Sequence, residues 1–306
     1  MKLWGEVNTN FHLSESKQDR VLVVTIHTND VQMLEMQHHL LSKHLKMPYD
    51  FVVGFDKPES EIFALGQNDT ESRFRDFTNA NGLSLVHIPR EAHYARDEIF
   101  HKSDFMGKPR PLNPAFRCAD SVQYMLSVVP WQKYRALLLI DADMFPIRDI
   151  EAIPVSFATP FYGVHQVRTH KKESVEYLWN GIFWISGDAP FQHLINFDFY
   201  NRRKLGTDVG GQTYKWIQQL AKLGRPGKFL NHHASGHWDR NLASQARVPE
   251  PLISWLENDY RNVDSGKYFA ELYDETFFHY RAGSNWQNRD PGIDLKNRAT
   301  LMEAVF

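Results

Sequence analysis

Short apolar runs of strand length alternate with helix-period stretches through the first half of the chain. The apolar runs are rich in Val, Leu, Ile and Phe and end at polar or turn-forming residues, as buried strands do. This alternation predicts an α/β fold with a mixed, mainly parallel central sheet flanked by helices. The predicted strands cover residues 20–26, 51–55, 83–88, 135–141, 161–167 and 177–185.

Apolar residues also recur at helical spacing. Leu34, Leu41 and Leu45 share one face of a predicted helix, and Thr28-Asn29-Asp30 supplies residues suited to cap its start. A second predicted helix begins near Asn113-Pro114 and stops at Pro130. Its apolar face carries Cys118, Val122, Met125 and Val129.

Periodicity is weaker in the second half of the chain. Thr207 is expected to cap a helix that runs to about Leu223, where Gly224 and Pro226 end it. Residues 227–306 are rich in His, Trp, Asn and Pro, and we expect them to form loops wrapped over a site. The whole chain, 1–306, is expected to form one continuous domain.

The apolar run after Arg135 ends abruptly in Asp141-Ala-Asp143. Carboxylates cannot remain buried as bare charges, and positions two apart on an extended backbone point to the same side. Both acids can therefore face one site beyond the strand end. Paired carboxylates in this position hold a hard divalent cation against substrate phosphates.

Composition narrows the function classes. The net charge of about −2 argues against general nucleic-acid binding through the phosphate backbone. The single cysteine, Cys118, excludes an internal disulfide framework and fits a reducing compartment. The first 20 residues lack an apolar signal region, and no stretch approaches the roughly 18 apolar residues of a bilayer span. We therefore expect a soluble, cytoplasmic protein.

In this strand context the Asp-Ala-Asp motif resembles the DxD of GT-A nucleotide-sugar glycosyltransferases. The segment Val24 to Asp30, Val-Thr-Ile-His-Thr-Asn-Asp, resembles the V-T-L-x-T-N-D loop of the glycogenin-like family, which holds the uracil and ribose of UDP. A loop after a parallel strand, at a helix start, is where open α/β sheets bind nucleotides. The resemblance implies that Ile26, Thr28 and Asn29 line the base.

Two further fragments follow in the family's order. Leu178 to Ile185 resembles its N-x-G-V-F strand, whose Asn faces the donor sugar, so Asn180 takes that role. Here the Gly follows the Asn directly, unlike in the family. Gly206 to Thr213 resembles its D-Q segment, in which Asp208 would lie by the sugar and Gln212 would supply an amide. A carboxylate there binds sugar hydroxyls or stabilises an oxocarbenium-like transition state.

The last fragment, Phe278 to Trp286, resembles the family's terminal H-x-x-G-x-x-K-P-W segment, in which His is the third ligand of manganese. The resemblance implies Asp141, Asp143 and His279 as ligands of manganese, or magnesium. The Lys-Pro pair is absent. Arg281 or Lys267 is then the candidate cation for the diphosphate. The implied donor-site residues are Ile26, Thr28, Asn29, Arg117, Asp141, Ala142, Asp143 and Gln212.

Together the fragments imply a metal-dependent GT-A glycosyltransferase. Its donor would be a nucleotide sugar, most simply a UDP-sugar, and its acceptor a carbohydrate or glycan hydroxyl. The nucleotide-binding half would span about 20–150 and the acceptor-binding half about 151–306. Asn180 and Asp208 would be catalytic, with retention at the anomeric carbon favoured. Inversion would need a base such as Asp208 or Glu257. The resemblance specifies neither the sugar nor the oligomeric state.

Several alternative readings stand beside this one. The Asp pair and Thr28-Asn29-Asp30 also suit local capping, Asn180-Gly181 suits a turn, and Asp208 suits a first helical turn. His232, His233 and His237 suggest a zinc site but lack a fourth ligand. The tryptophans that could stack on sugars are Trp179, Trp184, Trp238, Trp255 and Trp286.

Three other protein classes share parts of the pattern. A haloacid-dehalogenase-type phosphatase also places D-x-D after an apolar strand. Its motif usually lies near the N-terminus and has Thr or Val four positions after the first Asp, whereas here that position, 145, is Phe. A nucleotidyltransferase would usually carry a Gly-rich, Lys-bearing loop after the first strand, which 25–30 lack. A non-catalytic nucleotide- or carbohydrate-binding protein could keep the fold without turnover.

Overall fold

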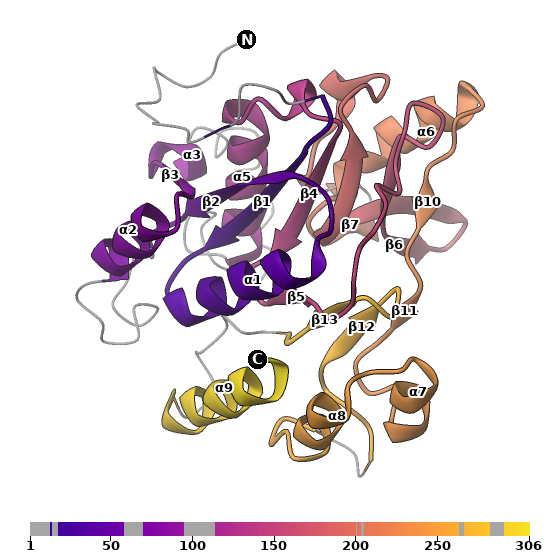
Figure 1. The fold of residues 1–306 in the computed structure, drawn as a ribbon. Coiled ribbons are helices and arrows are strands. Elements are labelled where there is room, and N and C mark those ends of the chain that lie inside the picture. Colours follow the sequence, from indigo (N-terminus) through magenta and orange to yellow (C-terminus); the bar gives the residue numbers. More distant parts are fainter. Residues whose placement is uncertain are drawn as a thin grey trace.

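The computed structural model describes residues 13, 18–57, 70–94, 114–199, 201–202, 205–262, 266–281 and 291–306. Helices and strands alternate in its first half; two long strands follow, and then mostly short elements (Figure 1). The helices are α1 Val31–His44, α2 Thr70–Ala80, α3 Glu91–Tyr94, α5 Pro114–Val128, α6 Tyr214–Lys222, α7 Arg240–Gln245, α8 Glu250–Glu257 and α9 Pro291–Val305. The strands are β1 Val21–His27, β2 Tyr49–Phe55, β3 Ser84–His87, β4 Ala136–Asp141, β5 Met144–Pro146, β6 Phe161–His170, β7 Glu173–Ser186, β8 Asn201–Arg202, β9 Leu205–Gly206, β10 Lys228–Phe229, β11 His232–His233, β12 Glu271–Tyr273 and β13 Phe277–His279.

A seven-stranded central sheet has the order β10-β6-β7-β4-β1-β2-β3. Strands β3, β2, β1 and β4 run parallel, and β7 joins them antiparallel to β4. The sheet is therefore mixed and mainly parallel, as the alternating pattern predicted. The carboxyl ends of β1, β2 and β4 share one edge, because Ile26 pairs with both Gly54 and Asp141. Ligands of open α/β sheets bind at such an edge.

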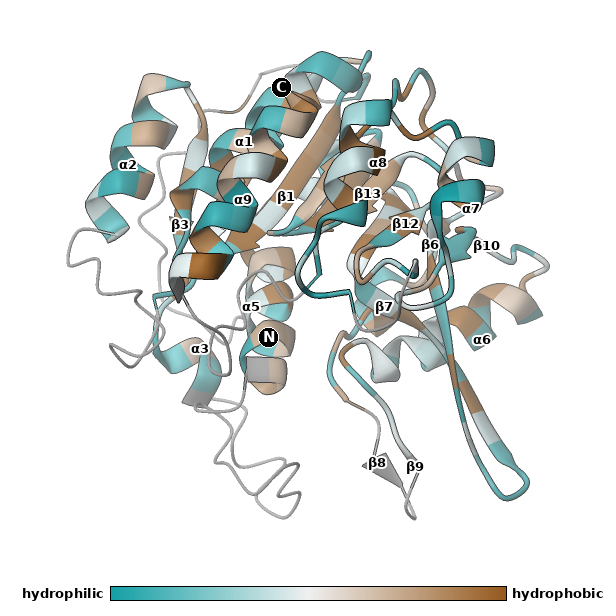
Figure 2. Ribbon diagram, turned by 90° about the horizontal axis from the view of Figure 1, so that it is seen from below, coloured by the Kyte–Doolittle hydropathy of each residue, from teal (hydrophilic) through white to brown (hydrophobic). Residues whose placement is uncertain are grey.

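Helices cover both faces of the central sheet. On one face, α1 and α2 pack through residues such as Leu34 and Phe74 against β1, β2 and β4. On the other, α5 and α6 pack through residues such as Met125 and Trp216. Figure 2 shows the apolar colouring concentrated on the central strands and hydrophilic colouring on outward helix surfaces. The sheet is thus buried on both faces, which explains the continuous apolar runs of its strands.

A second, four-stranded sheet of order β11-β12-β13-β5 lies beside α1. Its antiparallel pairs bury residues such as Phe145 and Phe278 against α8, α9 and the face of α1 that carries Met36. Helix α1 is therefore enclosed between two cores. The expectation of loops over 227–306 is wrong: the 15-residue helix α9, two shorter helices and two- or three-residue strands fill most of the described part of this region.

Local chemistry explains where several elements begin. Asp30 caps α1, since its side chain accepts a hydrogen bond from the Gln32 N–H, and this confirms the predicted cap. The expected cap at Thr207 is wrong, because the helix begins only at Tyr214. Gly210, with φ +98°, first turns the chain against β7, where a side chain would overlap the Leu178 carbonyl. A 3-10 turn, Gly211–Thr213, then leads into α6.

Other boundaries shift for similar reasons. Leu45 follows the end of α1, although it is buried with Leu34 and Leu41. Strands β6 and β7 extend beyond the predicted limits into an exposed polar hairpin, whose outer part lacks an apolar signal. Asn113 lies outside the described residues. Among the described residues, no helix combines the length and apolar character that a bilayer crossing requires.

Candidate metal centre at the end of the central strand

Three predicted ligand residues meet where the central sheet joins the second sheet. Asp141 is the last residue of β4, and Asp143 follows it in a tight turn that leads into β5. Strand β5 pairs with β13 so that Met144 lies opposite His279, and the Tyr280 N–H donates to the Asp143 carbonyl. This pairing carries His279 to the two acids across more than 130 positions of sequence.

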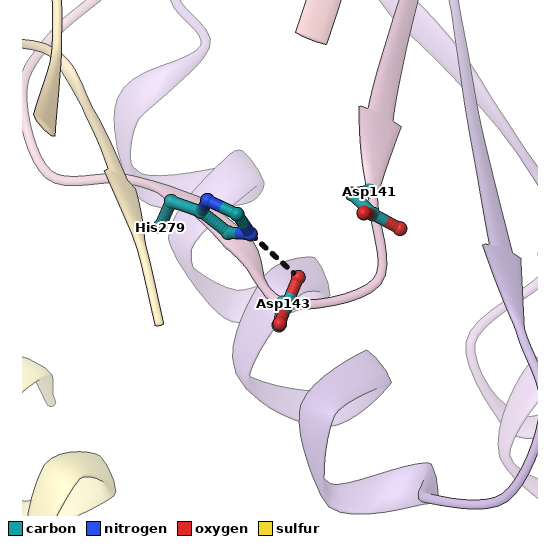
Figure 3. Close-up of side chains that lie close together, drawn as sticks. All are labelled: Asp141, Asp143 and His279. Atoms are coloured by element: carbon teal, nitrogen blue, oxygen red, sulfur yellow. Dashed lines mark hydrogen bonds and ion pairs between the residues drawn. The ribbon is translucent and has the colours of Figure 1, made fainter. Parts of the chain in front are cut away.

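The ligand atoms of Asp141, Asp143 and His279 lie within 4.8 Å of one another. His279 Nε2 is 3.1 Å from an Asp143 oxygen, and Asp141 lies beside them at the tip of β4 (Figure 3). Asp143 and His279 are buried, and Asp141 is partly so. Two carboxylates and an imidazole are a donor set that suits manganese, so the residues present fit such an ion.

Buried hydrogen bonds hold the Asp-Ala-Asp turn in shape. The Gln37 amide on α1 donates to the carbonyls of both Asp141 and Met144, each at 2.9 Å. Its oxygen faces His27 Nε2 at 3.2 Å. Burial lowers the pKa of His27 to about 4, so its ring is neutral and donates to Gln37. The Ala142 N–H donates to Asp141 itself. The Gln37 side chain therefore holds both ends of the turn in place.

Charge within the centre is unevenly compensated. Burial, and then the negative charge of Asp143, raises the pKa of Asp141. Burial would lower the pKa of His279, but Asp143 and Glu271 outweigh it and raise that pKa to about 10. The proton on His279 thus offsets part of the negative charge of the cluster. A divalent cation would offset more of it, which is the electrostatic reason for an ion here.

Asn180 and Asp208 both lie near Cys118, which is itself near Asp141. The Asn180 amide donates to the Cys118 sulfur at 3.0 Å. Burial raises the pKa of Cys118, and the charges of Asp141 and Asp208 raise it further, which places both acids near this thiol. Asn180-Gly181 lies inside β7, so the reading of these residues as a turn is wrong. Asp208 accepts from the Val209 N–H before the 3-10 turn and not within a helix.

Some of the remaining candidate donor-site residues lie at the carboxyl edge of the central sheet, and others are engaged in contacts elsewhere. Ile26 pairs directly beside Asp141, and Thr28 and Asn29 form the loop between β1 and α1. Gln212 donates to the Phe199 carbonyl, so its side chain is held by the segment that precedes β8. Arg117 forms an ion pair with Asp56, just after β2.

Arg117 and Asp56 line a cavity of about 380 Å³ at the carboxyl ends of β2 and β3. The other charged side chains around this cavity include the cations of Lys57 and Arg90 and the acid of Glu71. The cavity adjoins the loop after β1, because the Asp56 N–H donates to the His27 carbonyl. A cavity of this size at the carboxyl edge of the sheet lies where open α/β sheets bind ligands.

The two proposed cations for a diphosphate differ in position. Lys267 binds Asp239, the residue that caps α7. Arg281 lies two residues after His279, donates to Ser235 and remains partly exposed. Arg281 is therefore the better placed of the two. Glu257, the last residue of α8, forms an exposed ion pair with Arg240 of α7.

The histidine-rich segment does not gather into a zinc site. His232 stacks on Tyr273 and faces Glu271, whereas His233 stacks on Trp238. In the part of the chain that the structure describes, the one group of three potential ligands is Asp141, Asp143 and His279.

Most of the tryptophans are core residues rather than exposed faces. Trp184, Trp238 and Trp255 are buried, and Trp286 lies outside the described residues. Trp179 is only partly buried and lies against His279, with 5.5 Å between ring centroids. Gly181 permits this, since a side chain there would overlap the indole.

Two contributors were missed by the sequence reasoning: Gln37 and Glu271. Gln37 sits in an amphipathic helix, where a buried amide has no distinctive pattern. Glu271 lies opposite His279 in the β12–β13 pair. Apolar residues flank Asp274-Glu275 on both sides, but without the alternation that marks a hairpin in sequence.

Comparisons with known proteins give only distant likenesses. No known family profile and no curated protein sequence matches the chain. Among solved structures, the chain is similar to the WbbM bifunctional glycosyltransferase in its apo form, with 14% identity and a TM-score of 0.36, over 57% of this chain and 33% of that one. It is also similar to the mannosyltransferase PcManGT from Pyrobaculum calidifontis in complex with GDP-Man and Mn²⁺, with 12% identity and a TM-score of 0.38. That match covers 74% of this chain and 58% of the other, so both neighbours, glycosyltransferases by description, are matched over less than two thirds of their length.

Proposed function

We propose that this protein is a metal-dependent glycosyltransferase that transfers a sugar from a nucleotide-sugar donor to an acceptor hydroxyl. The observation that carries the proposal is the convergence of Asp141, Asp143 and His279 at the carboxyl end of β4, the central parallel strand. These residues would hold manganese, or magnesium. When bound, the ion would supply Lewis-acid stabilisation of charge on the departing nucleoside diphosphate.

The protein's own residues would position the rest of the donor. Ile26, Thr28 and Asn29 would line the base, which we take to be uracil on the family resemblance. The neighbouring cavity, with Arg117 at its wall, would receive part of the nucleotide. Arg281 would lie along the diphosphate, in place of the Lys that the chain lacks. This arrangement uses the shared edge of β1, β2 and β4.

Asn180 and Asp208 would contact the donor sugar, because both lie near Cys118 and Asp141. The acceptor hydroxyl would approach from the second half of the chain, where Trp179 offers an aromatic face beside His279. We propose retention at the anomeric carbon. Asp208 is the carboxylate that would serve as base if the enzyme inverts.

Calorimetric titration of UDP, GDP and their sugar conjugates, with Mn²⁺ and then with EDTA, tests the proposal. We expect one nucleotide to bind only with metal and to lose that binding in Asp143→Ala. Asp149→Ala is the matched control, since it removes an exposed carboxylate that follows β5 and is not one of the three candidate ligands. Nucleotide binding that ignores metal and Asp143, or no binding at all, would contradict the proposal. Hydrolysis of p-nitrophenyl phosphate that depends on Asp141 would instead indicate a phosphatase.

A further inference from the structure

Glu271 lies directly opposite His279 in the β12–β13 hairpin. Opposed residues in an antiparallel pair bring their Cβ atoms to about 5 Å, so their side chains meet. The register is fixed by a three-residue connection, Asp274 to Thr276, since Tyr273 pairs with Phe277 and the Thr276 N–H donates to the Tyr273 carbonyl. The position of Glu271 is therefore a direct consequence of how this hairpin turns.

The carboxylate of Glu271 is held by several donors. Its Oε2 accepts from His279 Nδ1 at 2.9 Å and from the Tyr273 hydroxyl at 2.7 Å. Its Oε1 faces His232 and Arg281, each at 3.6 Å. Only 11% of the side chain is exposed. Contacts on both oxygens leave Glu271 little freedom to turn away from His279.

This contact orients the imidazole. With Nδ1 facing Glu271, the other ring nitrogen, Nε2, faces Asp143 at 3.1 Å and lies within the candidate metal centre. A neutral imidazole that donates from Nδ1 presents its Nε2 lone pair to a metal. Histidine ligands generally need such a partner on the second nitrogen, because it fixes both the ring and its tautomer.

We propose that Glu271 is the positioning residue of the metal centre: it holds the His279 ring so that Nε2, and not Nδ1, serves as the ligand. This inference rests on the proposed function, since it assumes that Asp141, Asp143 and His279 bind the ion. Glu271 itself touches neither the ion nor the substrate. In the absence of nucleotide its effect on metal affinity passes through His279, whereas its contact with Arg281 bears on the proposed diphosphate site.

The test measures Mn²⁺ affinity by the electron paramagnetic resonance signal of free Mn²⁺, with and without the nucleotide identified by calorimetry. We expect Glu271→Ala to weaken Mn²⁺ binding about 10- to 100-fold. Glu271→Gln keeps an acceptor for Nδ1 and should restore part of the affinity. Glu275→Gln is the matched control, because it changes an exposed acid in the same hairpin. Thermal unfolding of each variant checks that it folds. If Glu271→Ala does not fold, the test is the smaller loss of Mn²⁺ affinity expected of Glu271→Gln.

A double-mutant cycle separates positioning from a general electrostatic effect. In a His279→Ala background, Glu271→Ala should cause no further loss of Mn²⁺ affinity. An equal loss in both backgrounds, or wild-type affinity in Glu271→Ala, would overturn the inference while leaving the proposed metal site intact. If the wild-type protein binds no Mn²⁺ in either condition, the proposed function itself fails.

Discussion

Two buried histidines, His279 and His93, lie between carboxylates near the carboxyl edge of the central sheet, yet their surroundings differ in charge balance. His93, on α3, is 3.1 Å from Asp56 and 3.6 Å from Asp120. Asp56 also binds Arg117 and accepts from the Ser121 hydroxyl. Burial would lower the pKa of His93, but the two acids raise it to about 9. Two acids therefore face two cations, and the cluster links β2, α3 and α5.

The cluster around His279 contains more acid than base. Arg281 offsets Glu271 from the solvent side, which leaves Asp141 and Asp143 to share His279. A histidine between two acids is therefore not in itself a metal site. In the cluster around His93 the charges balance, and the ion pairs hold neighbouring elements together. In the cluster around His279 the acids are in excess, and a bound cation would lower the electrostatic energy of the site.

The largest expected effect separates the two clusters by stability. Asp56→Asn should destabilise the protein by about 3 to 5 kcal/mol, because it leaves Arg117 and His93 with too little negative charge. Asp143→Asn in metal-free protein should cost less, about 1 to 2 kcal/mol, because loss of the charge-assisted hydrogen bond to His279 is partly offset by relief of repulsion with Asp141. Urea unfolding in EDTA measures both. Equal losses would show that the two clusters do not differ in this way.

The features of the site that could be predicted from sequence depend on local chemistry. The strand that ends at Asp141 is a continuous apolar run buried on both faces, so its sequence pattern can be recognised without knowledge of its neighbours. Asp30 caps α1 through a contact two residues away. The order of parallel strands then determines that Ile26 and Asp141 lie side by side.

The features that sequence did not reveal depend on distant contacts. Strands β12 and β13 have three residues each, too few for a periodic signal. Their turn, Asp274-Glu275, lacks the Gly that marks most such hairpins. Glu271 therefore looked like one more surface acid. Thr207 looked like a helix cap, although Gly210 delays the helix by packing against β7.

The pH dependence of stability should sharpen the comparison. A histidine whose pKa is raised on folding stabilises the protein fully below its ordinary value of 6.5, and this contribution is lost as the pH rises through the raised value, about 9 for His93. A rise of that size corresponds to about 3 kcal/mol. We expect His93→Gln to be less stable than wild type at pH 6 and to lose less stability between pH 7 and pH 10. Urea unfolding at several pH values measures this, and parallel curves for the two proteins would contradict it.

The smallest expected effect concerns the turn that sets the register of Glu271 and His279. Asp274 and Glu275 both have positive φ, 51° and 53°, a conformation that costs a non-glycine residue about 1 kcal/mol. Glu275→Gly removes that cost and loses only an exposed ion pair with Arg148, so it should stabilise the protein by about 0.5 kcal/mol.

Asp274→Gly is the comparison variant, because it relieves the same backbone strain but removes the acceptor of the Tyr162 hydroxyl, 2.5 Å away. It should therefore be no more stable than wild type. Both midpoints come from thermal unfolding, and Mn²⁺ affinity should be unchanged in Glu275→Gly, because the hairpin keeps its register. A loss of Mn²⁺ affinity in that variant would mean that the strained turn does more than align the two strands, and that the centre at His279 depends on backbone strain that the balanced cluster at His93 does not need.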